Sequence, residues 1–425
     1  MEKEKIDENN VLLNRLILSL FILVFIRMGT FIPVPGIDPS QLDFYMVRHS
    51  ITQRIFSTFS GNGTVIIGLF TLNIFPYINA SIIMQLIVNI FPKLSKLQKE
   101  GGSEGIRTIN KLTRLITFLW AILQSAGIAF YVKRAIFDWT PFLAFEIIIW
   151  LTTGALIVLW LSEIITEYSL GNGPSLLIYI NIISSLPNFL KSLINDSATL
   201  NSLFINAICL IGSLYGIVLL QEAVRRIPLI SSRQLSQASF LSFKNSNIET
   251  DYNYIPLRYN QAGVMPIILT TAILIIPTYI YNIGVLSIVT PILTFPAFAS
   301  SYKIIYWVAY FVLIVIFSLF YSTIVLNPKD ISYELQKMAV TIPGLRPGIE
   351  TTFYLKQVIQ RITVLGSLIL ALLTTVPNLI ATVFSISDFT SLGTTSLLIL
   401  VGVILDLTRE IRSIILSNIY NDMFN

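Results

Sequence analysis

The composition of the 425-residue chain excludes a water-soluble globule. Charged residues make up 12% of the chain, apolar residues make up 54%, and the mean hydropathy is +0.75, whereas an ordinary soluble domain is about 25% charged. A helix needs roughly 20 apolar residues to cross a bilayer, so the chain can supply many membrane spans and still leave sizeable loops. The formal charge of +5 therefore matters through where the charges sit.

Cysteine and histidine are too scarce for most site chemistry. The single cysteine, Cys209, excludes a disulfide framework and a cysteine-based metal site. The single histidine, His49, leaves no cluster for zinc and no Ser/His/Asp set. We therefore expect neither a cofactor nor enzymatic activity. Residues 1–10 carry four acidic side chains and no small-residue cleavage pattern follows, so we also expect no cleavable signal peptide.

Hydropathy predicts ten membrane-spanning helices. In chain order, the windows of about 19 residues lie near 16–32, 74–91, 112–132, 142–162, 174–190, 203–224, 263–281, 304–325, 358–380 and 395–412. A further apolar stretch at 55–70 is broken by glycines, which predicts a half-helix that enters the membrane without crossing it. Irregular backbone at that depth needs protein or a water-filled cavity around it, so this segment is the first indication of a pore.

The distribution of Lys and Arg sets the orientation of the spans. Ten spans place both termini on one side, and 21 of the 28 basic residues fall on that side, in the N-terminus, in the segments 93–114, 225–262 and 326–361, and at Arg409 and Arg412 at the end of the tenth span. The opposite loops carry six. By the positive-inside rule, the termini and the long basic segments face the cytoplasm, or the stroma if the membrane is a thylakoid.

The polar stretch at 191–202 divides the chain into two halves, at 1–195 and 196–425, with five predicted spans each. An odd number of spans per half places the halves in opposite orientations, which is the arrangement of an inverted repeat with a site at the bilayer midplane. The expected fold class is thus an all-α integral membrane protein with ten helices in two inverted halves.

The second span carries a candidate constriction. Ile74 and Ile78 lie four residues apart, on one face of a helix. Two interpretations stay open: they face lipid or neighbouring helices, or they belong to a ring of branched side chains that closes a pore sterically and by dewetting.

The tract Gly171-Asn172-Gly173-Pro174 before the fifth span predicts a tight turn and a helix start.

Ionisable residues within the spans are few, and most fall near span ends. They are Arg27, Glu146, Glu163, Glu222 and Asp406. Side chains at such positions reach the interface by snorkelling. Ion-coupled transporters usually place paired ionisable groups near the midplane, so this scarcity argues against a proton- or sodium-coupled pump.

The basic cytoplasmic segments 225–262 and 326–357 are too long for tight connections, which favours a docking role. In the second segment, the stretch 342–348 (IPGLRPG) brackets Arg346 with turn-forming residues and predicts a rigid tip that presents this side chain. A solvated loop and a contact with an anionic or acidic partner, including ribosomal RNA, are the two open interpretations.

Eight strings occur in an order that resembles one family. They are FIPVPGID (31–38), NIFPYINASIIMQL (73–86), KEGGSEG (99–105), LSEIITEYSLGNGPS (161–175), NQAGVMP (260–266), NPKD (327–330), IPGLRPG (342–348) and TSLLILVGVILD (395–406). Together they resemble the SecY family, the channel subunits of the bacterial and plastid Sec translocase. The resemblance implies a ten-helix clamshell with an hourglass pore, which conducts unfolded polypeptide across the membrane and releases hydrophobic segments sideways into lipid.

The resemblance also implies roles for individual residues. The pore ring would comprise Ile74, Ile78, Ile178, Ile268 and Ile399, with Pro174 at a sixth position where the family usually has an aliphatic residue such as isoleucine. The stretch 55–70 would be the plug under the ring, including Phe59, Gly61, Gly63, Val65 and Ile66.

The resemblance also implies residues of a lateral gate and of a docking site. The seams between the second and third spans and the seventh and eighth would form a lateral gate, with Gln85 as a polar member. The residues implied in docking a partner are Arg346 first, and then Arg225, Arg226, Arg233, Lys244 and Arg258.

The implied partners are SecE-like and SecG-like small subunits, the SecA motor ATPase, the ribosome, signal peptides, nascent chains and membrane lipid. The implied location is a bacterial plasma membrane or a plastid thylakoid membrane, and the composition fits both.

A secondary transporter for a small solute is an alternative, motivated by the broken helix and the inverted halves. A membrane enzyme is a third, for which the sequence offers no recognisable catalytic set.

Overall fold

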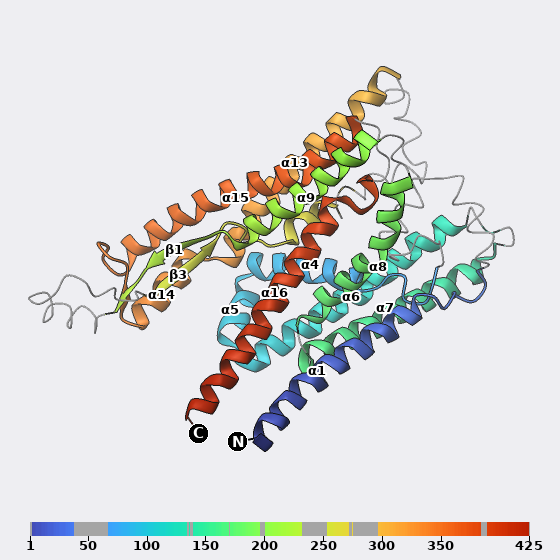
Figure 1. Ribbon diagram of the computed structural model, residues 1–425. Helices are drawn as coiled ribbons and strands as arrows, with labels where there is room; N and C mark the ends of the chain where they lie inside the picture. Colours follow the sequence, from blue (N-terminus) through green and yellow to red (C-terminus); the bar gives the residue numbers. More distant parts are fainter. Residues whose placement is uncertain are drawn as a thin grey trace, which may run out of the picture. The chain divides into compact units, whose positions relative to one another are not determined.

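The computed structural model describes residues 2–37, 67–133, 139–169, 171–195, 200–231, 253–271, 296–383 and 389–424, together with Ile136 and Leu274. These residues form two compact units, shown as ribbons in Figure 1. The first unit contains residues 1–206 and 384–425, and the second contains residues 207–383. These two units are defined by which residues pack together. They differ from the two predicted halves of five spans each, which are defined by the order of the spans along the chain and stay a prediction.

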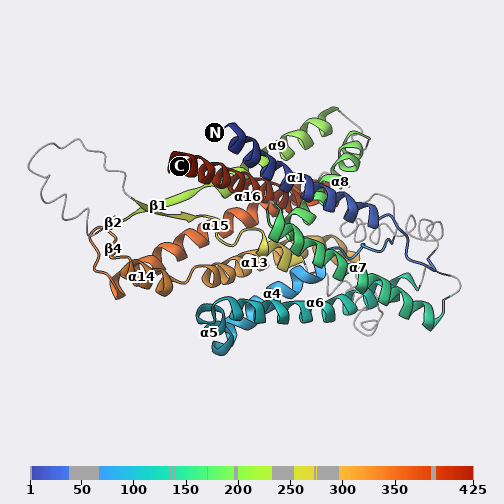
Figure 2. The same ribbon diagram turned by 90° about the horizontal axis from the view of Figure 1, so that it is seen from below.

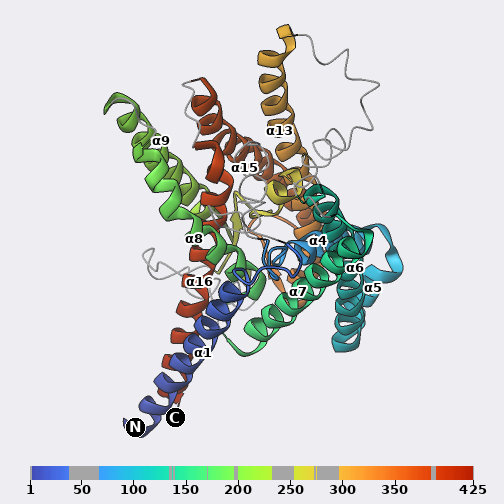
Figure 3. The same ribbon diagram turned by 90° about the vertical axis from the view of Figure 1, so that its right-hand side faces the viewer.

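The first unit is a set of packed helices. They are α1 (Glu2–Gly29), α4 (Phe75–Ile90), α5 (Pro92–Glu100), α6 (Gly102–Val132), α7 (Pro141–Tyr168), α8 (Gly173–Asn195), the start of α9 (Leu200–Glu222) and α16 (Phe389–Phe424). Helix α6 packs against α4, α5 and α7, and α8 packs against α7 and α16. In Figure 3, α1 and α16 run to the same end of this unit, where the two termini lie close together.

Local sequence explains where several of these helices begin. Helix α7 begins at Pro141, a residue suited to the first turn, and the side chain of Thr140 accepts a hydrogen bond from the Leu143 N–H. Between α4 and α5, Phe91 is extended because Pro92 follows it. The chain therefore turns by 108° at this point.

The core of the first unit joins four segments. Buried aliphatic side chains from residues 34–37, residues 67–72, α6 and α7 pack together: Val34, Ile37, Ile67, Leu72, Ala121, Ile128, Ala129, Val132, Ile147, Leu151 and Ala155. Large apolar side chains of α6 and α7, such as Phe118, Leu119 and Phe145, remain exposed on the outer faces. This pattern is typical of helices that meet lipid on one side and protein on the other.

The second unit combines long helices with short strands. It contains most of α9, β1 (Val224–Pro228), β2 (Ile230–Ser231), β3 (Tyr254–Arg258), α13 (Pro296–Val325), α14 (Pro328–Lys337), β4 (Val340–Thr341) and α15 (Ile349–Val383). Strand β1 pairs antiparallel with β3, with Arg225 opposite Leu257, and β2 pairs antiparallel with β4. Figure 2 shows the strands and α14 at one end of this unit.

Helices α13 and α15 run alongside each other in Figure 1 and form the main helical contact of the second unit. The hydroxyls of Ser322 and Thr363 share a buried hydrogen bond of 2.7 Å across this contact. Serine and threonine join membrane helices effectively, because their small side chains permit close approach and hydrogen-bond across the seam.

The predicted spans fall on helices throughout, although only residues 265–271 and Leu274 of the window at 263–281 are described as helical. Within the described ranges, four helical stretches are long and apolar enough to cross a membrane: Gly102–Phe130, Pro141–Tyr168, Trp307–Lys337 and Ile349–Pro377. The bent pair α4 and α5 makes a fifth if it is one span. The count of ten stays a prediction.

Candidate functional site

The residues predicted for the pore ring lie on four helical segments. Ile74 and Ile78 belong to the start of α4, Pro174 and Ile178 to the first turns of α8, and Ile399 to α16, all in the first unit. Ile268 lies in the helical residues 265–271 of the second unit. Helices α8 and α16 pack against each other, so the structure places two ring-bearing helices side by side.

Burial separates the six positions into two groups. Ile74 and Ile78 are only 1% and 3% exposed, whereas Pro174, Ile178, Ile268 and Ile399 are half-buried. A side chain so deeply covered by protein does not face lipid. Ile74 and Ile78 therefore either pack against neighbouring helices or line a pore. The choice between packing against helices and lining a pore stays with the ring prediction.

The chain leading into α4 is held firmly, and we call residues 67–73 the α4 anchor. Its first residues pair with the segment after α1: Val34 N–H donates to the Ile67 carbonyl at 3.0 Å, and Leu69 N–H donates to the Ile32 carbonyl at 2.9 Å. A Cβ at Gly154 of α7 would overlap the Leu69 carbonyl oxygen. The missing side chain thus lets the α4 anchor lie directly against α7.

Asn73 ends the α4 anchor in a left-handed conformation, with φ of +47°. Its side-chain oxygen accepts the Ile74 N–H at 2.7 Å, which satisfies a backbone donor at the helix start. Asparagine is one of the few residues that tolerate this conformation. The backbone conformation of Asn73 and this hydrogen bond therefore fix the position of Ile74, the first residue of the predicted ring. In the sequence, Asn73 stands out only as a polar residue before an apolar run.

The predicted plug residues Phe59, Gly61, Gly63, Val65 and Ile66 lie outside the described residues. Of the stretch 55–70, only residues 67–70 are described, and they belong to the α4 anchor. Gln85, the predicted gate residue, is half-buried on α4, the helix that packs most extensively against α6. The role of Gln85 stays a prediction.

The turn before α8 confirms the expectation drawn from its glycines and proline. Gly171 has φ of +85°, α8 begins at Gly173, and Pro174 occupies the first turn. The Gly173 N–H donates to the Thr166 side-chain oxygen at 3.0 Å, which closes the turn against the end of α7.

Glu163 and Asp406, two of the charges predicted near span ends, form ion pairs. Arg114 of α6 donates two hydrogen bonds of 2.8 Å to the carboxylate of Glu163 on α7, a bidentate pair that is partly exposed. Arg409 contacts Asp406 at 3.4 Å within α16, and the Asp406 side chain is 75% exposed. Pairs with this exposure contribute roughly 0–1 kcal/mol each, so they orient neighbouring groups more than they stabilise the fold.

The described parts of the two predicted docking segments, at 225–231, 253–262 and 326–357, contain short strands and helices where we expected loops. We call these parts the docking surface after their predicted role. Arg225 and Arg226 are exposed on β1, and the Arg226 guanidinium lies 4.9 Å from the centre of the Tyr254 ring on β3. Arg258 is exposed at the end of β3. Arg233 and Lys244 lie outside the described residues.

A hydrophobic cluster supports this docking surface from below. It joins β1, β3, α14, α15 and residue 342, with the buried side chains Ile227, Leu229, Leu257, Leu335, Ile342, Leu355, Val358, Ile359 and Ile362. Sequence reasoning missed this cluster because its members are spread over two basic segments and the start of a span. The cluster gives the segments a fixed shape.

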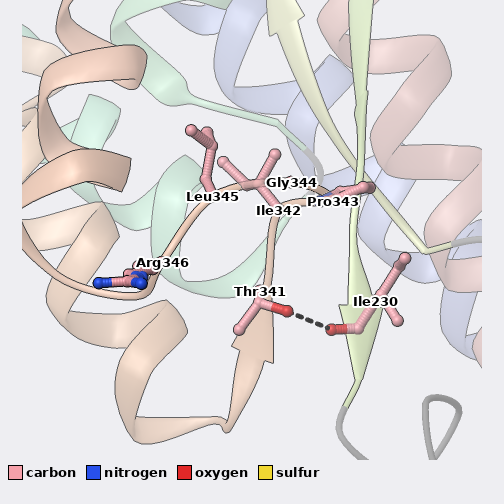
Figure 4. A pocket seen from close by; sticks show the side chains of 7 residues that line it. All are labelled: Ile230, Thr341, Ile342, Pro343, Gly344, Leu345 and Arg346. Atoms are coloured by element: carbon pink, nitrogen blue, oxygen red, sulfur yellow. Dashed lines mark hydrogen bonds between the residues drawn. The ribbon is translucent and has the colours of Figure 1, made fainter.

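The tip at residues 342–348 leaves this surface as a tight turn. Gly344 and Gly348 have positive φ, and the exposed Arg346 is held through its backbone N–H, which donates to the Glu350 carboxylate at 3.2 Å. Figure 4 shows the Arg346 side chain beside a shallow pocket of about 360 Å³. The pocket is lined by Ile230 and residues 341–346.

The geometry thus describes a helical membrane protein with a buried aliphatic helix start and a basic surface formed by short strands. A family model for SecY matches residues 68–408. The chain belongs to the SecY family.

Relatives of high identity cover nearly the whole chain. It is 67% identical over 422 residues to the protein translocase subunit SecY of Trieres chinensis, covering 99% of both chains. It is 41% identical to that of Guillardia theta, with 96% of both chains covered, and 38% identical to that of Synechococcus elongatus, with 96% of this chain and 93% of the relative covered.

Solved structures share the fold at lower identity. A protein-conducting channel matches with a TM-score of 0.64 at 20% identity, covering 94% of this chain and 92% of that one. Sec61 from the canine ribosome-channel complex matches with a TM-score of 0.60 at 19% identity and the same coverage. These matches confirm the predicted all-α membrane fold, while the count of ten helices and the two inverted halves stay predictions. The relatives confirm the predicted family.

Proposed function

We propose that the chain is the central pore-forming subunit of a Sec translocon, which conducts unfolded polypeptides across the membrane and releases hydrophobic segments laterally into the bilayer. The observation that carries this proposal is the 67% identity, over 99% of the chain, to a protein translocase subunit SecY. The solute-transporter alternative has no support among the relatives.

The ring of aliphatic residues would act as the seal. A channel for many sequences cannot depend on specific hydrogen bonds, whereas a compliant apolar collar fits around each passing residue and limits ion leakage by dewetting. The burial of Ile74 and Ile78 and the contact between α8 and α16 support this role. In a related SecY structure, the plug domain stabilises the closed state and maintains a membrane seal, and we assign residues 55–70 the same role.

Lateral release would follow transfer free energy. A leucine-rich segment gains by entering lipid, whereas a charged residue at the centre of a helix costs about 2.5–3.5 kcal/mol on insertion scales. The channel would thus sort its substrates by partitioning. No catalytic group is needed for this step, so the energy for secretion comes from a partner.

The basic docking surface would receive that partner. A Sec61 and an Ssh1 complex have been solved with the ribosome, and the exposed Arg346, Arg225, Arg226 and Arg258 offer positive charge to ribosomal RNA or to an acidic motor surface such as that of SecA. Small SecE-like and SecG-like subunits complete the assembly in this proposal.

The proposed location is a plastid thylakoid membrane or a bacterial plasma membrane. The basic segments and both termini would then face the stroma or the cytoplasm. The outer ends of α1 and α16 lie close together in the first unit (Figure 3), which is compatible with the even number of spans that we propose.

Reconstitution tests the proposal directly. Vesicles that hold the chain with its small partner subunits should pass an unfolded secretory substrate when the motor and ATP are added, and Arg346→Glu should reduce this transport several-fold while leaving resting ion conductance unchanged. Replacing Ile78 or Ile268 with Gly or Asn should raise resting conductance. If gradient-driven uptake of a small solute occurs and Arg346→Glu has no effect on secretion, the transporter alternative replaces the proposal.

A further inference from the structure

The turn between α7 and α8 is tied to two other helices of the first unit. The Ser169 hydroxyl donates to the Arg15 carbonyl oxygen of α1 at 2.8 Å. The Gly171 N–H donates to the Glu410 carboxylate of α16 at 3.0 Å, across 239 positions of sequence. This turn, of which residues 169 and 171–172 are described, therefore connects α1, α7, α8 and α16. Neither the local sequence nor the translocon proposal assigns a role to Glu410.

Helix α16 approaches this turn as closely as the atoms allow. Gly171 has φ of +85°, and a Cβ there would lie 2.7 Å from Leu407 Cδ2 and 3.2 Å from Leu176 Cδ1. Glu410 follows Leu407 by three residues, so both side chains point to the same face of α16. Packing and a hydrogen bond thus act at one point of the contact between α8 and α16.

The chemistry at this point favours a carboxylate. Backbone N–H groups at the start of a helix lack partners within the helix, and the N-terminal end of α8 carries partial positive charge. Hydrogen bonds from N–H groups to an ionised carboxylate are stronger than those between neutral groups. Glu410 is half-buried, which reduces competition from water.

The two helices joined in this way both carry ring residues. Ile178 lies seven residues after Gly171 on α8, and Ile399 lies 11 residues, or about three turns, before Glu410 on α16. A shift of α16 along α8 would move one isoleucine past the other. We propose that Glu410 is a positioning residue, which fixes α16 against the start of α8 and so keeps Ile178 and Ile399 in register for the resting seal.

This inference rests on the proposed ring, so its test needs one measurement that does not depend on the ring. The first measurement is hydrogen exchange of the peptide containing residues 169–173, in the chain reconstituted with its partner subunits. The second is resting ion conductance of the same samples. The variants are Glu410→Ala, which removes the acceptor, and Glu410→Gln, which keeps an oxygen acceptor at the same distance. Asp406→Ala, one turn away and exposed, is the matched control.

We expect Glu410→Ala to speed exchange of the Gly171 amide and to raise resting conductance several-fold. Glu410→Gln should restore most of both properties, and Asp406→Ala should change neither. If Glu410→Ala does not accumulate, Glu410→Asp replaces it, because its shorter side chain withdraws the acceptor but keeps the charge, and we expect an intermediate conductance.

The inference is overturned if Glu410→Ala leaves exchange at Gly171 unchanged, if exchange speeds up without a rise in conductance, or if Glu410→Gln conducts as much as Glu410→Ala. Failure of the ring itself gives a different result: substitutions at Ile78 and Ile268 would leave conductance unchanged, while the exchange of Gly171 would still respond to Glu410.

Discussion

The α4 anchor and the docking surface hold their side chains in place by different kinds of contact. The α4 anchor places an aliphatic side chain, Ile74, by means of backbone hydrogen bonds, a left-handed asparagine and a glycine of α7 that permits close contact. The docking surface places basic side chains on short strands and a turn, above a cluster of buried aliphatic residues. One device relies on close backbone contact, and the other relies on burial.

The difference follows from what each region presents. The proposed seal would consist of apolar side chains, which form no directional bonds, so its geometry would have to come from the backbone that carries them. Charged side chains that meet a partner are long and solvated, and they gain from a rigid base that limits the conformational entropy lost on binding. Loss of burial should therefore harm the docking surface most, and loss of close backbone contact should harm the α4 anchor most.

The largest effect is expected at the centre of the buried cluster. Leu355 is 0% exposed, and Leu355→Ala should lower the stability of the docking surface by about 2–5 kcal/mol, through lost burial and the cavity left behind. Hydrogen exchange of the β1 and β3 amides measures this loss. Ile349→Ala, at a position that is 89% exposed on the same helix, should change exchange little. Equal effects of the two substitutions would show that burial does not support the surface.

A smaller effect is expected where α7 meets the α4 anchor. Gly154→Ala places a methyl group against the Leu69 carbonyl, and overpacking of this kind costs about 1–3 kcal/mol. The thermal midpoint of the first unit in detergent should fall. Gly127→Ala is the matched control, because a Cβ there meets nothing within 4 Å, and alanine suits a helix better than glycine by about 0.5–1 kcal/mol. A stabilised Gly154→Ala variant would contradict the close contact.

The smallest effect is expected at Asn73. Asn73→Ala puts an ordinary residue into a left-handed conformation, which costs roughly 1–2 kcal/mol, and removes the acceptor for the Ile74 N–H. Resting ion conductance should rise modestly. Asn73→Gly removes the same acceptor without the conformational cost, so it should leak less than Asn73→Ala. If Asn73→Gly conducts more than Asn73→Ala, the left-handed backbone conformation is not what positions Ile74.

The sequence predicted the elements that depend on local pattern. The hydropathy windows fall on helices wherever the structure describes them, apart from a few residues at their ends, and the tract Gly171-Asn172-Gly173-Pro174 predicted the turn before α8. Helices α1 and α16 are longer than the apolar windows, because their ends continue into polar residues. Hydropathy does not detect these polar ends.

The sequence could not predict features that depend on partners far along the chain. Strands β1 and β3 are short, basic and separated by more than 20 residues, so no alternation of apolar residues marked them. The hydrogen bond from Gly171 to Glu410 joins residues 239 positions apart. The α4 anchor before Asn73 pairs with residues 32–34, more than 30 positions earlier in the sequence.

The most direct test of the central claim is crosslinking of a stalled translocating chain to single-cysteine variants. The one native cysteine, Cys209, is first replaced by serine. Cysteines at positions 78, 178, 268 and 399 should all crosslink to the same stalled polypeptide, whereas a cysteine at the exposed outer position 119 of α6 should not. Crosslinking at position 119 with none at the four ring positions would contradict the account.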